Sequence, residues 1–65
     1  MGILDDIKAL NLDPTDPFQA ARAISLTNAA PAAQEKLISE WETAMNTTMP
    51  AAARTAAGIK TLTEE

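Results

Sequence analysis

Three prolines limit the length of every helix that this chain of 65 residues can form. Proline lacks a backbone N–H, fits the first turn of a helix, and biases the preceding residue away from helical conformation. Pro17, Pro31 and Pro50 therefore predict three helix starts, and none of them is expected inside a helix. An apolar pattern that begins at Ile3 predicts one more short helix before them. We expect helices near 3–10, 17–27, 31–47 and 51–62.

The fold class predicted by these segments is all-α, a small array of three to four short helices. No segment alternates apolar and polar residues over the length of a strand, and valine and tyrosine are both absent. A chain of this length is enough for one small domain. We therefore expect a single domain over residues 1–65, with a helix in 1–12, a central helix pair in 17–49, and a last helix and tail in 50–65.

The segment between Pro31 and Pro50 carries the clearest helical pattern. Its apolar residues recur at steps of three and four and form one stripe. The members of this stripe are Leu37, Ile38, Trp41, Ala44, Met45 and Met49. Because the stripe includes the only tryptophan of the chain, we expect the other segments to pack against it.

The segment after Pro50 is expected to complete the core. Four of its residues align on one helix face: Ala52, Thr55, Ile59 and Leu62. Arg54 is expected to face outward. The candidate core residues of the whole chain are Leu37, Ile38, Trp41, Met45, Ile59 and Leu62. Tryptophan and methionine are also common at interfaces, so the alternative is that Trp41 and the methionines form a recognition face.

The loop before Pro17 holds two aspartates that compete as helix caps. Asp16, with Pro17 at the first helical position and Gln19 two residues later, approximates a capping box. Asp13 with Pro14 is the competing start. Two carboxylates in one turn offer too few oxygens for calcium, so we assign them to capping and not to a metal. In the next break, Asn28 either ends one helix in the left-handed conformation or caps the following one.

The composition argues against catalysis. Histidine and cysteine are absent, which removes the usual general base, the usual nucleophile, disulfides and most transition-metal sites. Only two glycines are present, so there is no glycine-rich phosphate loop. Glu35 and Glu42 share a helix face, but paired carboxylates need an enclosed pocket to act as acid and base, and we expect a solvated face. We predict no enzymatic activity, no cofactor, no metal and no small-molecule substrate.

The charge pattern argues against nucleic acid as a partner. The net charge is −4, and the basic residues are scattered, whereas phosphate binding needs clustered lysine and arginine. No apolar run reaches the length of a membrane span, and the N-terminus lacks the pattern of a secretion signal. We expect a location in the cytoplasm or within an assembly such as a virion, without secretion by a signal peptide and without a membrane.

Unevenly distributed apolar residues point to protein partners. In the 17–27 segment, Phe18 and Leu26 lie on one side of the helix and Ile24 lies well away from both. The first helix is too short to persist without a surface to lie on. The candidate interface residues are Ile3, Leu4, Ile7, Phe18, Ile24 and Leu26.

We therefore predict a structural or adaptor subunit that binds other protein chains as a homo- or hetero-oligomer. A minor component of a phage particle is one assembly that fits such a chain. The alternative is a small soluble regulator or inhibitor that binds a single protein partner.

Overall fold

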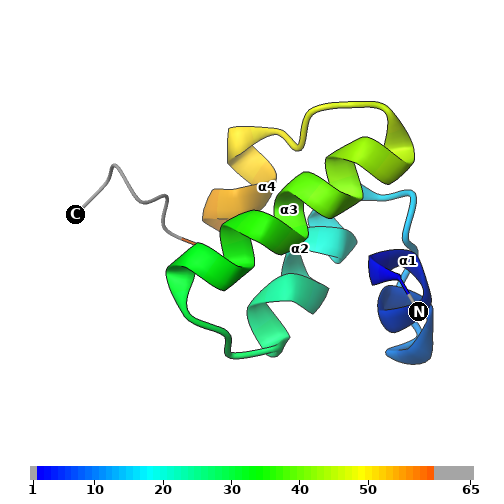
Figure 1. Ribbon diagram of the computed structural model, residues 1–65, viewed down its shortest axis with the longest axis horizontal. Helices are drawn as coiled ribbons and strands as arrows, with labels where there is room; N and C mark the ends of the chain where they lie inside the picture. Colours follow the sequence, from blue (N-terminus) through cyan, green and yellow to red (C-terminus); the bar gives the residue numbers. More distant parts are fainter. Residues whose placement is uncertain (1, 60–65) are drawn as a thin grey trace.

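Four short helices account for most of the chain between residues 2 and 59, which are the residues that the computed structural model describes. They are α1 (Ile3–Ala9), α2 (Pro17–Leu26), α3 (Pro31–Met45) and α4 (Ala51–Ala56) (Figure 1). No strand occurs in this part of the chain, so the predicted all-α class is confirmed. All four helices start where the sequence predicts.

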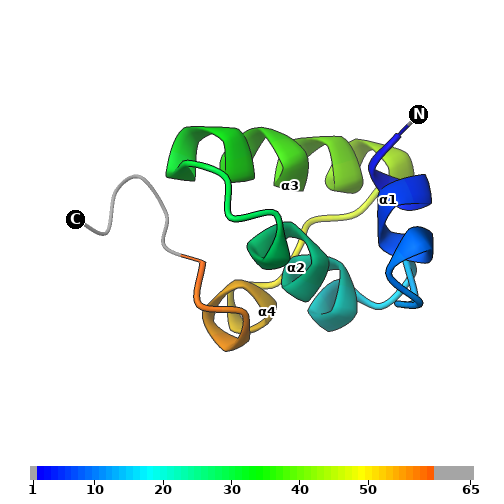
Figure 2. The same cartoon turned by 90° about the horizontal axis from the view of Figure 1, so that it is seen from below.

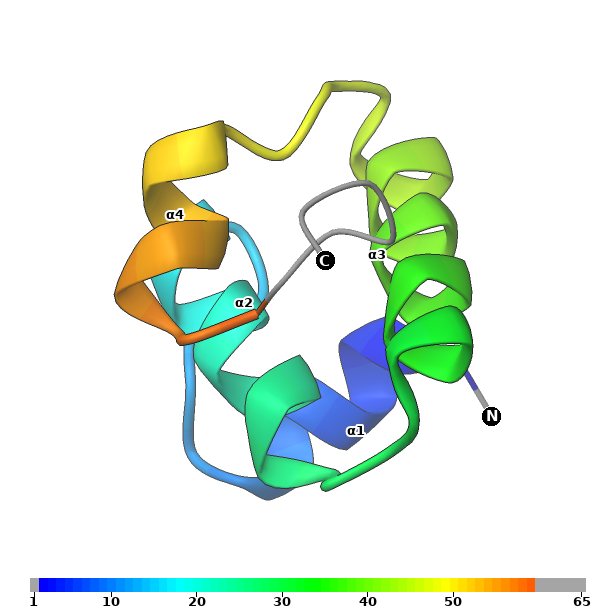
Figure 3. The same ribbon diagram turned by 90° about the vertical axis from the view of Figure 1, so that its left-hand side faces the viewer.

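Helix α2 lies at the centre of the arrangement and packs against each of the other three helices. Figure 2 shows α3 along one side of α2 and α4 on the opposite side. Figure 3, from a perpendicular direction, shows the same order, with α1 lying across one end. Helix α1 also packs against α3, and α4 contributes Ala53 to the core from the other side of α2.

The helix starts are fixed by local sequence signals. Pro17 and Pro31 are the first residues of α2 and α3, and Pro50 immediately precedes α4, as predicted. Asp16 caps α2, because its Oδ1 accepts a hydrogen bond of 2.9 Å from the backbone N–H of Phe18. The side chain of Gln19 donates to Asp16 Oδ2 at 3.1 Å, but its oxygen accepts from the backbone N–H of Asp13. The N–H of Asp16 donates to the carbonyl of Asp13, so the reciprocal bond of the predicted capping box is not formed.

Each helix is followed by a residue in the left-handed conformation. Asn11, Asn28, Asn46 and Gly58 have φ values of 60°, 55°, 55° and 77°. Asparagine and glycine adopt this conformation at lower cost than other residues, and it ends a helix by turning the chain back on itself. Asn28 thus ends α2 and does not cap α3, which is preceded by Ala30.

The last helix is shorter than predicted. The sequence predicts a helix that reaches residue 62, but α4 ends at Ala56. Residues 60–62 of the predicted helix lie outside the described residues. The left-handed Gly58 interrupts it, and the N–H of Ile59 bonds back to the carbonyl of Arg54 at 2.9 Å. Because the helix stops before Ile59, the predicted alignment of Ile59 with Thr55 is wrong, and Ala53 is the buried residue of α4 instead.

The core is built from large side chains on α1, α2 and α3, from Met49 and Ile59 in the segments on either side of α4, and from alanines. Trp41 is 1% exposed, and its indole Nε1 donates a hydrogen bond of 2.8 Å to the carbonyl of Pro14 in the loop before α2. The buried hydrophobic residues are Ile3, Ile7, Ala20, Ala21, Ala23, Ile24, Ile38, Trp41, Met49, Ala53 and Ile59. Trp41 therefore belongs to the core and not to a recognition face.

Most of the predicted core residues lie where the sequence placed them. Ile38, Trp41 and Ile59 are buried, while Leu37 and Met45 are partly buried and pack against the core. Leu62 lies outside the described residues. In the apolar stripe, Ala44 is exposed, whereas Met49 is buried from the loop that follows α3.

We expect Asp16→Ala to lower the free energy of unfolding by about 1 kcal/mol, because the N–H of Phe18 loses its acceptor at the start of α2. Urea unfolding followed by circular dichroism measures this change. Asp13→Ala is the comparison, since Asp13 lies in the same loop but does not cap α2. An Asp16→Ala variant as stable as the unmodified chain would contradict the assignment of the cap.

Candidate functional site

Helix α2 has two apolar sides, and only one of them faces the core. Its inner side buries Ala20, Ala21, Ala23 and Ile24. On its outer side, Phe18 is 49% exposed and Leu26 is 60% exposed. Single exposed apolar side chains are common on protein surfaces, but two large ones on the same helix face mark a candidate contact surface.

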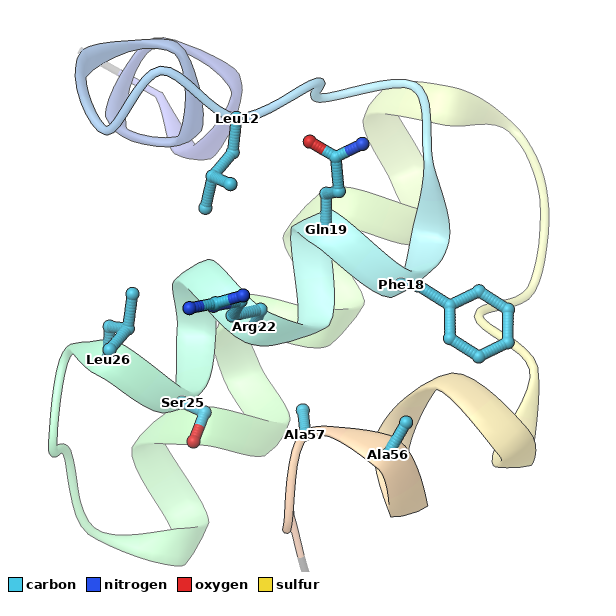
Figure 4. A pocket seen from close by; sticks show the side chains of 8 residues that line it. All are labelled: Leu12, Phe18, Gln19, Arg22, Ser25, Leu26, Ala56 and Ala57. Carbon is cyan, nitrogen blue, oxygen red and sulfur yellow. The ribbon is translucent and has the colours of Figure 1, made fainter.

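A groove runs along this outer side of α2, between α2 and α4, with a volume of about 590 Å³. Figure 4 shows α2 as its floor, with Phe18 at one end and Leu26 at the other. Leu12 projects toward the groove from the loop after α1, and Ala56 and Ala57 border it on the side of α4 (Figure 4). We call this the α2–α4 groove, lined by Leu12, Phe18, Gln19, Arg22, Ser25, Leu26, Ala56 and Ala57.

Among residues 2–59, Arg22 is the one charged residue that lines the α2–α4 groove. It is exposed and lies on α2 between Phe18 and Leu26, about one helical turn from each (Figure 4). The ion pairs found among residues 2–59 all involve Arg54, so no carboxylate of this part of the chain pairs with Arg22. The groove therefore combines apolar ends with a positive charge at its centre.

Two ion pairs join α4, which forms one border of the groove, to α3. Arg54 was expected to face outward, but it faces α3, where its guanidinium lies 3.6 Å from Glu35 Oε1 and 3.5 Å from Glu42 Oε2. The same Glu42 oxygen accepts a hydrogen bond of 2.7 Å from the backbone N–H of Met49. Glu35 and Glu42 are thus partly buried partners of Arg54, and the expectation of a solvated face is wrong for this pair.

We expect Glu42→Ala to lower the free energy of unfolding by about 1.5–3 kcal/mol, since a hydrogen bond to a charged acceptor is lost along with an ion pair. Glu35→Ala is the matched control. It removes only an ion pair and should cost about 0–1 kcal/mol. Thermal melting of both variants measures the difference. Equal losses would show that the bond to Met49 contributes nothing.

The two aspartates of the loop before α2 are occupied by hydrogen bonds within that loop. The hydroxyl of Thr15 donates to Asp13 Oδ1 at 2.7 Å, and the backbone N–H of Thr15 donates to the same atom at 2.9 Å. These two hydrogen bonds lower the pKa of the Asp13 carboxyl below its ordinary value. Asp16 is used as the cap of α2. Among residues 2–59, no three histidine, cysteine or acidic side chains gather as ligands for a metal ion.

The six candidate interface residues separate into two groups. Phe18 and Leu26 line the α2–α4 groove and remain candidates. The other four pack in this chain's own interior: Ile3, Ile7 and Ile24 are buried, and Leu4 is partly buried against them. The assignment of these four residues to an interface is therefore wrong. Helix α1 packs its apolar face against α2 and α3, so this face is covered within the chain itself.

Six groove residues were not singled out as site residues by the sequence pattern: Leu12, Gln19, Arg22, Ser25, Ala56 and Ala57. Arg22 could have been found, since it lies one turn from both Phe18 and Leu26 on the same helix face. The alanines of α4 carry no such signal, because their proximity to α2 depends on tertiary packing.

No protein-family model, curated protein or solved structure matches this chain. None of the helices formed by residues 2–59 has both the length and the apolar character needed to cross a membrane.

Proposed function

We propose that this chain is a non-enzymatic structural or adaptor subunit that binds another protein chain through the α2–α4 groove. The observation that carries the proposal is the exposure of Phe18 and Leu26, 49% and 60%, at the two ends of one groove. Both side chains lie on a helix whose opposite side is fully occupied by the core. A partner can therefore cover them without any rearrangement of the fold.

The energetics favour a partner that covers more than these two side chains. Burying the exposed halves of a phenylalanine and a leucine contributes about 1.5–3 kcal/mol together, which is too little for stable binding. Interfaces of standard size bury about 800 Å² on each partner, a substantial part of the 4230 Å² surface of this chain. We therefore expect the groove to form the apolar centre of a larger contact with a polar rim.

The test is co-purification of the full chain with its natural partners, followed by native mass measurement. Leu26→Asp should abolish the complex, because it places a charge at the apolar end of the groove, while the isolated chain stays folded. Ser39→Asp introduces the same charge at an exposed position of α3 outside the groove and should leave the complex intact. Retention of the partner by folded Leu26→Asp, or a chain that binds no protein at all, would overturn the proposal.

The stoichiometry of the complex distinguishes the two kinds of binding protein. Many fixed copies in one particle favour a structural subunit, such as a component of a virion. A single partner in a one-to-one complex favours a regulator or inhibitor.

A further inference from the structure

We infer that the segment received by the α2–α4 groove is a helix of a different protein chain, with a carboxylate between two apolar side chains at four-residue spacing. The inference rests on the proposed function, since it specifies the chemistry of the partner at that groove.

The spacing of the groove residues favours a helix as the occupant. Phe18, Arg22 and Leu26 follow one another at intervals of four residues along α2. At a rise of about 1.5 Å per residue, this row is about 12 Å long, the length of about two helical turns. Rows of this kind on two helices pack into one another. A partner helix with residues at the same interval can therefore pack its row beside this one, close to all three side chains.

The small residues on the other border of the groove leave room for a helix. Ala56 and Ala57 face α2 across the groove and carry only methyl side chains (Figure 4). Addition of a strand requires an exposed sheet edge, and residues 2–59 form no strand. The described part of the chain therefore offers no edge for strand addition, and its row of side chains suits an amphipathic helix laid into the groove.

The positive charge of Arg22 in the groove favours an acidic residue at the centre of the partner helix. A partner that covers Phe18 and Leu26 also removes water from Arg22, which lies between them. Burial of a guanidinium is costly unless an acceptor replaces the lost water. Residues 2–59 bring no carboxylate to Arg22, and a carboxylate of the partner would fill that place. An aspartate or glutamate forms the strongest pair, with two charge-assisted hydrogen bonds to the planar guanidinium.

A second copy of this chain fits the groove less well. Most dimers are symmetric about a two-fold axis, so the same face of both copies would meet. The two Arg22 side chains would then approach each other at the centre of the contact, and like charges disfavour such an interface. A different chain with a carboxylate avoids this repulsion.

Two matched helical peptides test the inference on the full chain. One carries leucine, glutamate and leucine at four-residue spacing, and the other has lysine in place of the glutamate. Backbone amide chemical shifts of the labelled chain report where and how tightly each binds. We expect the glutamate peptide to shift the amides of Phe18, Leu26 and Ala57 and to bind at least about tenfold more tightly than the lysine peptide.

Charge reversal in the protein provides the decisive comparison. Arg22→Glu should invert the preference, so that the lysine peptide binds more tightly. Lys36→Glu makes the same change of charge on α3, outside the groove, and should preserve the original preference. An unchanged preference in Arg22→Glu would overturn the inference.

Binding measurements on the natural complex distinguish a failure of this inference from a failure of the proposed function. If Leu26→Asp abolishes the complex but Arg22→Glu leaves its affinity unchanged, the groove binds a protein and the chemistry assigned to the partner is wrong. Sedimentation of the purified chain gives a further check. A dimer that Leu26→Asp dissociates would identify a second copy as the occupant and would also overturn the inference.

Discussion

Replacement of Trp41 by alanine should remove most of the stability of this domain, with a loss of about 3–5 kcal/mol. The side chain is 1% exposed and is the largest in the core, so its removal leaves a cavity between α3 and its neighbours. The change also removes the hydrogen bond of 2.8 Å from the indole to the carbonyl of Pro14, which ties α3 to the loop before α2. Circular dichroism melting of the two proteins measures the loss.

Trp41→Phe separates the two contributions of this side chain. Phenylalanine keeps most of the apolar volume but cannot donate to Pro14. The unsatisfied carbonyl should cost about 1–3 kcal/mol, and the smaller ring adds a modest packing loss, so this variant should remain folded at room temperature. An unchanged melting temperature in Trp41→Ala would show that the indole is exposed in solution and would return Trp41 to the candidate interface.

The helix starts could be predicted because their causes are local. Pro17 and Pro31 act through their own rings, and Asp16 acts on the N–H of Phe18, two residues away. The same holds for the side of α3 that faces the core, where Ile38 and Trp41 keep to one helical stripe. Such features need no knowledge of the remaining chain.

The C-terminal helix could not be predicted correctly because its orientation depends on distant residues. Gly58 ends α4 early, so the phase inferred from Ile59 does not apply to the helix. Arg54 turns toward α3 because two carboxylates, Glu35 and Glu42, are placed there by the packing of the helices. A pattern of helical spacing within one segment carries no information about such pairs.

The candidate site was predicted in part. Periodicity correctly placed Phe18 and Leu26 on one side of α2 and Ile24 on another. It could not determine which side faces the core, because that depends on how α1 and α3 approach α2. The groove border formed by Ala56 and Ala57 could not be predicted either, since those residues lie near α2 only in the folded chain.

The two sides of helix α2 therefore have different roles, one in the core and one at the groove. Its inner side holds the fold together through small alanines and Ile24, which allow α1, α3 and α4 to approach it. Its outer side presents Phe18, Arg22 and Leu26 to the groove and contributes little to the core. A variant on one side should therefore affect stability, and a variant on the other side should affect binding.

Ile24→Asp tests this division, and we expect it to unfold the isolated chain. Ile24 is 0% exposed, and its side chain is surrounded by the core of the domain. A carboxylate there would be buried without a charged or hydrogen-bonding partner, at a cost of several kcal/mol, comparable with the whole stability of a small domain. Circular dichroism at neutral pH should show the loss of most helical signal.

Leu26→Asp is the matched control, because it introduces the same residue on the same helix, two positions further along. Leu26 is 60% exposed but ends α2, where a carboxylate opposes the helix dipole, so its replacement should lower the free energy of unfolding by about 1 kcal/mol while it prevents binding at the groove. The contrast between the two variants excludes a general effect of an added charge on α2. A folded Ile24→Asp chain that has lost only its partner would instead place Ile24 at the interface and would refute the assignment of the inner side of α2 to the core.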